Sequence, residues 1–186
     1  VFFGRASNNR SSVLASDADR RTGRTVDDYV SDPDAPETVS RGSGDLAGLT
    51  ASSSASDANA SLRLGPGFGP QAAVDGDQST VWASGSFGSA AGEWIELELV
   101  RPSDVTGLTV SLESLPRRVA TPGEVRVDTD AGAATSRVLP GAGPQRIAVP
   151  TGTTTSIRVT VTEVVEGESA NGVAIAEIGV PGLDLG

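Results

Sequence analysis

The sequence predicts an all-β protein, an antiparallel β-sandwich preceded by an N-terminal extended segment. Three observations support this fold class. Short segments in which apolar and polar residues alternate recur from Leu46 to the C-terminus, clusters of Gly, Pro and Asp separate these segments, and none of them has a sustained helical period. Short strands at regular spacing, without convincing helices, are typical of antiparallel sandwiches.

The clearest strand is Trp94 to Leu99, which places Ile95, Leu97 and Leu99 on one face and Glu96 and Glu98 on the other. This alternation indicates a strand with one face buried. The same pattern predicts further strands at Val105 to Leu112, Glu124 to Asp128, Arg146 to Val149, Ile157 to Val161 and Val173 to Val180. Turns are expected at 130–132 and 140–144, where Asp, Gly and Pro gather.

Residues 1–46 differ from the predicted module at 47–186. They are rich in charge and poor in large apolar side chains, and Pro33 and Pro36 favour extended or turn conformations. We expect a strap or linker lying on its neighbour, and a disordered tail is the alternative. Because the chain begins with Val1 and contains no Met, we expect it to be a piece of a larger protein or a processed product.

Composition argues against an enzyme. The chain has no Cys, no His and no Lys, which removes imidazole general bases, Cys and Lys nucleophiles, and zinc sites built from Cys and His. Glycoside chemistry with two carboxylates survives this exclusion. The candidates for such a pair are Glu166 with Glu168 or with Glu113.

Charge limits the partners. The formal net charge of −10 repels the phosphates of nucleic acids and anionic lipid headgroups.

No apolar run approaches the roughly 20 residues that span a bilayer, so the fragment itself is not expected to cross a membrane.

The most informative stretch is Ala72 to Gly85, with the pattern D-G-D-x-S-T-x-W, followed by Glu93-Trp94-Ile95-Glu96-Leu97. This pairing resembles discoidin-like domains, also called coagulation-factor type C domains. These belong to the galactose-binding jelly rolls that include many carbohydrate-binding modules. The resemblance covers roughly residues 47–182 and extends to the last predicted strand. It implies a jelly-roll fold and a binding role without catalysis.

The resemblance also implies a structural calcium ion. The implied ligands are the carbonyls of Ala72, Asp77 and Ala176, the carboxylates of Asp75 and Glu177, and the carbonyl and hydroxyl of Thr80. The chemistry agrees, because calcium takes six to eight oxygen ligands from carboxylates and main-chain carbonyls. The alternative is a surface turn in which Ser79 and Thr80 form only local hydrogen bonds.

Sugar-binding sites usually combine an aromatic platform with polar side chains that bond the sugar hydroxyls. Trp82 and Trp94 are expected to be packing residues. The loop residues that could contact a ligand are Phe68, Phe87, Arg117, Arg118 and Asn171. The alternative for the two phenylalanines is that they anchor loops to the core. The alternative for the polar candidates is that they belong to solvated, charged loops.

The Val-Phe-Phe-Gly start, the run from Leu49 to Ser54 and basic residues that are all Arg make the sequence similar to discoidin-like modules of actinobacterial cell-wall arabinofuranosyltransferases. That resemblance implies an extracytoplasmic module in the cell envelope, tethered by the membrane-embedded remainder of its parent. The implied ligand is arabinan or another cell-wall polysaccharide. The alternative function is a structural spacer or protein-interaction domain without a sugar site of its own.

Overall fold

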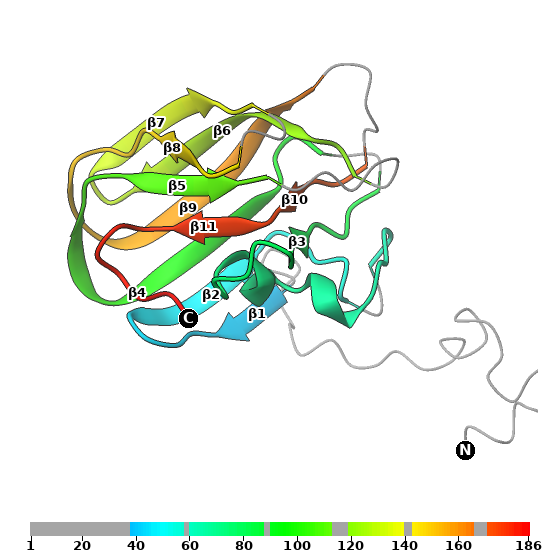
Figure 1. Cartoon of the computed structure of the whole chain (residues 1–186), viewed down its shortest axis with the longest axis horizontal. Coiled ribbons are helices and arrows are strands. Elements are labelled where there is room, and N and C mark those ends of the chain that lie inside the picture. Colours follow the sequence, from blue (N-terminus) through cyan, green and yellow to red (C-terminus); the bar gives the residue numbers. More distant parts are fainter. Residues whose placement is uncertain (1–37, 58–59, 88–89, 113–118, 140–142, 166–170) are drawn as a thin grey trace, which may run out of the picture. The chain divides into compact units, whose positions relative to one another are not determined.

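A computed structural model describes residues 38–57, 60–87, 90–112, 119–139, 143–165 and 171–186. These residues form two facing β-sheets, which confirms the predicted antiparallel sandwich (Figure 1). Every pairing between the strands is antiparallel, and one isolated parallel bridge joins Ala120 to Val173.

The larger sheet has six strands in the order β1-β2-β4-β9-β6-β7. β1 with β2 and β6 with β7 form hairpins, whereas the other neighbours are far apart in the chain: β4 pairs with β9, for example, with Ile95 opposite Val159. The strands are β1 (Thr38–Arg41), β2 (Leu46–Ala51), β4 (Trp94–Val105), β9 (Gly152–Val164), β6 (Pro122–Thr129) and β7 (Gly132–Arg137).

The smaller layer is a three-stranded sheet in the order β11-β5-β8, with bounds Glu177–Gly179, Leu108–Ser111 and Gln145–Ile147. A separate pair joins β3 (Trp82–Ala83) to β10 (Ala174–Ile175). Two single-turn 3₁₀ helices, η2 (Pro66–Phe68) and η3 (Pro70–Ala73), precede β3. Among the described residues, no helix has the length and apolar character needed to cross a membrane.

The core lies between the two sheets. Ile95 and Leu97 of β4 face it, as do Val110 of β5 and Ile178 of β11, and all belong to one buried cluster. Trp82 of β3 joins this cluster and has no solvent exposure, so it packs as the sequence predicted. Large apolar side chains on the inward faces of these strands therefore stabilise the sandwich by their removal from water.

The predicted strands are present, but two of them are divided. The run Val173 to Val180 is not one strand, because β10 pairs with β3 and β11 pairs with β5, with a break at Ala176. The run Val105 to Leu112 is divided between the end of β4 and β5. The strands β1, β2, β3 and β7 were not predicted; the β7 sequence Gly-Ala-Ala-Thr-Ser-Arg lacks the apolar alternation. The expected boundary between residues 46 and 47 falls just inside β2, which begins at Leu46. Residues 1–37 of the expected strap lie outside the described residues.

Candidate functional site

The segment Ala72–Thr80 forms a tight acidic loop between η3 and β3. Gly76 adopts a φ of 76°, a left-handed conformation that favours glycine. The side chain of Asp75 accepts a hydrogen bond from the Asp77 N–H at 2.9 Å, and Asp77 in turn accepts from the N–H of Ser79 at 2.9 Å. These are Asx-type bonds, in which each aspartate fixes the backbone two residues further along the chain. The loop is therefore held in shape by its own side chains.

The Thr80 hydroxyl lies at the centre of this loop, among four acceptor oxygens. Its Oγ1 lies 2.9 Å from each carboxylate oxygen of Asp75, 2.8 Å from the carbonyl of Asp77 and 3.3 Å from the carbonyl of Ala72. A hydroxyl has one proton and can donate to only one of them. Oxygen atoms of Ala72, Asp75, Asp77 and Thr80 thus converge, and the single hydroxyl proton cannot form a hydrogen bond with each acceptor. A hard cation stabilises such an arrangement.

Glu177 brings a second acidic side chain to this loop from β11. Its Oε2 accepts a hydrogen bond from the N–H of Gly76 at 3.1 Å, across 101 residues of chain. Burial, and next the negative charge of Asp75, raise the pKa of Glu177 from 4.5 to about 7. Asp77 raises this pKa further, while the Gly76 N–H lowers it. The loop therefore places negative charge close to a carboxyl group that resists ionisation.

The donor set fits calcium better than a metal that prefers nitrogen or sulfur. Among the described residues, no three acidic side chains form a metal-binding group by themselves. Main-chain carbonyls and the Thr80 hydroxyl would complete the coordination. No ion pair within the described segments connects an arginine to Asp75, Asp77 or Glu177. The expected ligand Ala176 adjoins Glu177, and the roles of its carbonyl and that of Thr80 stay predictions.

The pair β3–β10 links this acidic loop to a group of loops that we call the loop end, made of residues 84–87, 119–121 and 171–173. Ser84 follows β3 and Val173 precedes β10. The Ser84 N–H donates to the Val173 carbonyl at 2.9 Å, and the Val173 N–H donates to the Ser84 Oγ at 2.9 Å. The N–H of Ala120 donates to the carbonyl of Asn171 at 3.0 Å. These bonds hold the three segments together.

The expected ligand residues separate into three groups. Phe87 lies at the loop end with 67% of its surface exposed, whereas the half-buried Phe68 packs on a small cluster that includes Val81 and Val119. Asn171 is half-buried at the loop end. Arg117 and Arg118 lie outside the described residues, as do Glu113, Glu166 and Glu168. Of the two phenylalanines, Phe87 alone has the exposure that a ligand platform needs, and Phe68 is a loop anchor.

The fold and the motif agree with a comparison against known families. Residues 50–184 match the model of the family described as "Arabinofuranosyltransferase D, third carbohydrate binding module". The chain belongs to this family. It is a carbohydrate-binding module and not an enzyme, which agrees with the missing Cys, His and Lys side chains.

Two relatives are similar to the module in sequence. An α-(1→3)-arabinofuranosyltransferase of Mycobacterium tuberculosis is 31% identical over 185 residues, which are 98% of this chain and 13% of that protein. The cryo-EM structure of the mycobacterial arabinofuranosyltransferase AftD is 34% identical, with a TM-score of 0.65 over 77% of this chain and 10% of that one. The module thus spans about an eighth of the length of this curated relative.

One more distant structure bears on the fold alone. The family 32 carbohydrate-binding module of Clostridium perfringens NanJ, solved with galactose, has 16% identity and a TM-score of 0.54, over 71% of this chain and 90% of that one. This similarity supports the jelly-roll architecture that the D-G-D motif predicted.

Trp94 differs from its expected role as a packing residue. It is half-buried on the outer face of β4, and the guanidinium of Arg158 lies 4.2 Å from the centre of its ring. The alternation of apolar and polar residues along β4 indicates this orientation. Ile95, Leu97 and Leu99 face the core, so Trp94 must face outward with Glu96 and Glu98. The polar side chains that surround Trp94 on this outer face come from separate strands, and no sequence pattern connects them.

Proposed function

We propose that the module recognises a glycan of the cell wall, arabinan or another cell-wall polysaccharide, at its loop end. The observation that carries this proposal is the exposure of Phe87, an aromatic side chain at 67% exposure in a member of a carbohydrate-binding family. Among the described residues, three large apolar side chains are strongly exposed, and Phe87 is the aromatic one of the three. An aromatic ring offers an apolar surface for the carbon-bound face of a sugar.

The loop end supports this role because its backbone is fixed before any ligand arrives. Ser53 donates to Glu93, a buried carboxylate, at 2.8 Å, and accepts from the N–H of Gly85 at 2.9 Å. Its hydroxyl also lies 3.3 Å from that of Ser86, the residue before Phe87. A preformed loop loses less conformational entropy on binding, so weak sugar contacts yield more net affinity.

A calcium ion at the Ala72–Thr80 loop forms the second part of the proposal. The support is the crowding of acceptor oxygens around the Thr80 hydroxyl and the raised pKa of Glu177, both of which added positive charge would relieve. Calcium supplies electrostatic stabilisation there and takes no part in a reaction. Asp75 and Glu177 would join the loop to β11 through it, and binding to the folded chain alone stabilises the fold in proportion to affinity.

The proposed ion would also affect the loop end. Three residues of extended chain lie between Thr80 and Ser84, and the four residue steps span about 13 Å. The segment between them contains β3, which pairs with β10 through Ile175 opposite Trp82 and Ala174 opposite Ala83. This pair connects the acidic loop to the loop end. Fixing one end of this short pair restricts the other end. We therefore expect calcium to strengthen glycan binding indirectly.

The setting follows from the relatives. The module would be extracytoplasmic, in the cell envelope, and tethered by the membrane-embedded remainder of a parent arabinofuranosyltransferase. Glycosyl transfer would belong to that remainder, and the module would hold or orient arabinan near it. A second candidate, a structural spacer or protein-interaction domain, is favoured by Phe68, which anchors a loop and leaves the platform with one phenylalanine.

The test is a titration of the chain with arabinofuranose oligosaccharides in calcium buffer. Phe87→Ala is expected to weaken binding roughly three- to tenfold, because one aromatic contact contributes about 0.5–1.5 kcal/mol. Leu139→Ala is the matched control, since Leu139 has 66% exposure but lies after β7, outside the loop end. Equal affinities of the two variants would remove the loop end from the proposal, and absence of binding by the unsubstituted chain would favour the spacer.

A further inference from the structure

A polar groove crosses the outer face of the six-stranded sheet. Its volume is about 560 Å³, within the range of small-ligand sites. The side chains that define it come from β4, β9 and β6 and from the turn after β6: Glu96, Arg158, Thr160, Arg126, Asp128 and Asp130. Glu96 belongs to the strand motif that suggested the fold, but the sequence assigned none of these residues to a binding site, and the proposed loop site uses none of them.

The position of the groove follows from strand alternation. Ile157, Val159 and Val161 of β9 point into the core, so Ser156, Arg158 and Thr160 point outward. The outward side chains come together through sheet pairing, because Glu96 lies directly opposite Arg158 and Arg126 opposite Thr160. The groove is thus a property of the paired sheet and not of one loop.

Arg158 is held in place on two sides. Its Nε and Nη2 both donate to Oε2 of Glu96, the first at 2.9 Å, and its guanidinium stacks on the ring of Trp94 at 4.2 Å. A guanidinium has five N–H groups, and these two contacts leave the Nη1 amino group for a ligand. Stacking and pairing together reduce the rotamer freedom that an arginine otherwise loses on binding.

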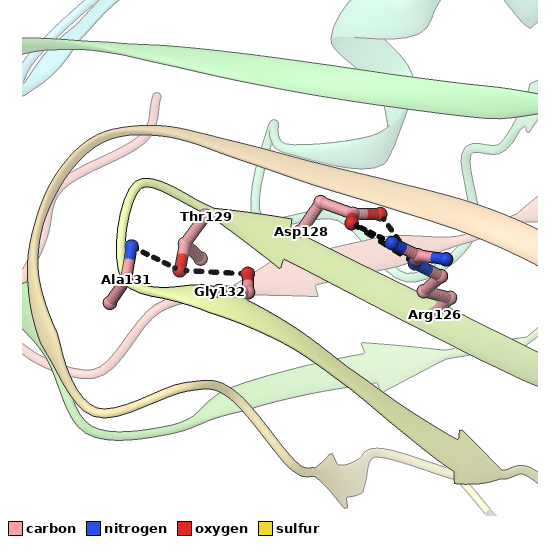
Figure 2. A network of polar contacts seen from close by, with 5 residues as sticks. All are labelled: Arg126, Asp128, Thr129, Ala131 and Gly132. Atoms are coloured by element: carbon pink, nitrogen blue, oxygen red, sulfur yellow. Dashed lines mark hydrogen bonds and ion pairs between the residues drawn. The ribbon is translucent and has the colours of Figure 1, made fainter.

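Arg126 repeats this arrangement along β6 (Figure 2). Its Nε lies 3.0 Å from both carboxylate oxygens of Asp128, and its Nη2 donates to Oδ1 at 2.6 Å. The adjoining turn is also fixed, because the Thr129 hydroxyl donates to the Gly132 carbonyl and accepts from the Ala131 N–H (Figure 2). The second guanidinium therefore also presents Nη1, from a more exposed position than the first.

Charge balance indicates what this groove accepts. Glu96 pairs with Arg158 and Asp128 with Arg126, while the third acid, Asp130, accepts hydrogen bonds from the N–H and hydroxyl of Thr155. An anion at the Nη1 groups would gain little electrostatic energy, because a carboxylate already balances the charge of each arginine, and it would face the third carboxylate. A neutral ligand with many hydroxyls can accept from the remaining guanidinium N–H groups and donate to the remaining carboxylate lone pairs.

We propose that this groove is a second binding site of the module and takes a neutral, hydroxyl-rich glycan chain across β4, β9 and β6. The inference rests on the proposed function only in taking a glycan as the ligand class. The groove side chains are separate from Phe87 and Asn171. A module with two such sites can bind two segments of one polysaccharide, which raises overall affinity through effective concentration.

The experiment is a titration of the ¹⁵N-labelled 186-residue chain with neutral arabinofuranose oligosaccharides, followed by amide chemical shifts. Two sets of resonances are expected to move, one at the loop end and one on β4, β9 and β6. Arg126→Ala should weaken the sheet response roughly tenfold, as expected for loss of a charged hydrogen-bond donor, and leave the loop response unchanged. Arg137→Ala is the matched control, because Arg137 is an exposed arginine on β7 that does not line the groove.

The outcomes separate the two proposals. Movement of the loop set alone overturns the groove and keeps the loop site. Movement of the sheet set alone supports the groove and overturns the loop site, and no movement overturns both. Inorganic phosphate serves as the anionic probe: a sheet response to phosphate that is stronger than the response to the neutral oligosaccharide would overturn the assignment of ligand class. Equal responses of Arg126→Ala and Arg137→Ala would also overturn the groove.

Discussion

Replacing Glu177 by Gln is expected to affect stability with opposite signs in the presence and absence of calcium. In the metal-free chain, the pKa of Glu177 is raised to about 7 by burial and by Asp75. A raised pKa in the folded state means that the associated stability is complete below the ordinary value of 4.5 and is lost as the pH rises through about 7. At pH 8 the ionised Glu177 therefore destabilises the metal-free fold, and Gln removes this charge.

The magnitude follows from the size of that rise. A change from 4.5 to about 7 corresponds to roughly 3.4 kcal/mol at full strength. Because Glu177 is only half-buried, screening by solvent reduces the effect to about 1–2 kcal/mol. For a domain of about 150 residues this is roughly 2–8 °C in Tm. Gln can still accept the Gly76 N–H, so the variant keeps the hydrogen bond that joins β11 to the loop.

With calcium the sign reverses, because the variant lacks a carboxylate ligand. A free calcium concentration of 100 times Kd would stabilise the unsubstituted chain by about 2.7 kcal/mol, and Glu177→Gln should lose most of this gain. The assay is thermal unfolding at pH 8 with chelator and with millimolar calcium. Glu98→Gln is the control, since Glu98 is an exposed glutamate on β4. A Glu177→Gln variant that is less stable by the same amount in both buffers would refute the reasoning, as would an unsubstituted chain whose Tm does not respond to chelator.

Three further substitutions test the frame around the two candidate sites. Glu93→Ala should lower the free energy of unfolding by about 2–3 kcal/mol in urea titrations, because it removes the acceptor of the buried Ser53 hydroxyl and of the partly buried Ser52 hydroxyl, whereas Glu98→Ala should change it little. Gly85→Ala should destabilise the loop end, since its Cβ would lie 2.6 Å from a main-chain carbonyl oxygen, while Gly67→Ala meets open space and serves as the control in the same melts. Asp130→Asn should lower Tm at pH 7, because hydrogen bonds from Thr155 of β9 hold the pKa of Asp130 below 3.8. The difference in Tm between the variant and the unsubstituted chain should disappear as the pH falls through that lowered pKa. A difference in Tm that does not change with pH would contradict this reasoning.

The sequence predicted the acidic loop well because most of its information is local. Asp75, Gly76, Asp77 and Thr80 lie within six residues, and each has a conformational or chemical reason to be there. The contact with Glu177 is remote in the chain, and it was expected only through the family resemblance. The structure brings Glu177 within hydrogen-bonding distance of the Gly76 N–H, and its role as a metal ligand stays a prediction.

The groove on the outer face could not be predicted in the same way. Glu96 and Arg158 are 62 residues apart, and they meet only because β4 pairs with β9 in one particular register. A shift of one residue would turn each of them to the opposite face. Periodicity identifies which side chains face outward on one strand, but it carries no information about which strand lies beside it.

β7 is a strand that hydrophobic periodicity could not detect. Gly132–Arg137 is an edge strand with partly or fully exposed side chains, so no core contact selects apolar residues there. Its position is determined by the hairpin turn after β6 and by main-chain hydrogen bonds to β6. Alternation of hydrophobicity detects buried faces, and a strand without one leaves no such pattern.

The most direct test of a calcium-stabilised glycan-binding module is the affinity of the chain for arabinofuranose oligosaccharides, measured by calorimetry on one preparation with calcium and again after chelation. The account predicts measurable binding with calcium and lower affinity after chelation, because the proposed ion fixes the β3–β10 pair that leads to Phe87. Restoring calcium should restore the affinity. Equal affinity in both buffers would contradict the proposed link between the ion and the loop end, and absence of binding in both would contradict the glycan assignment itself.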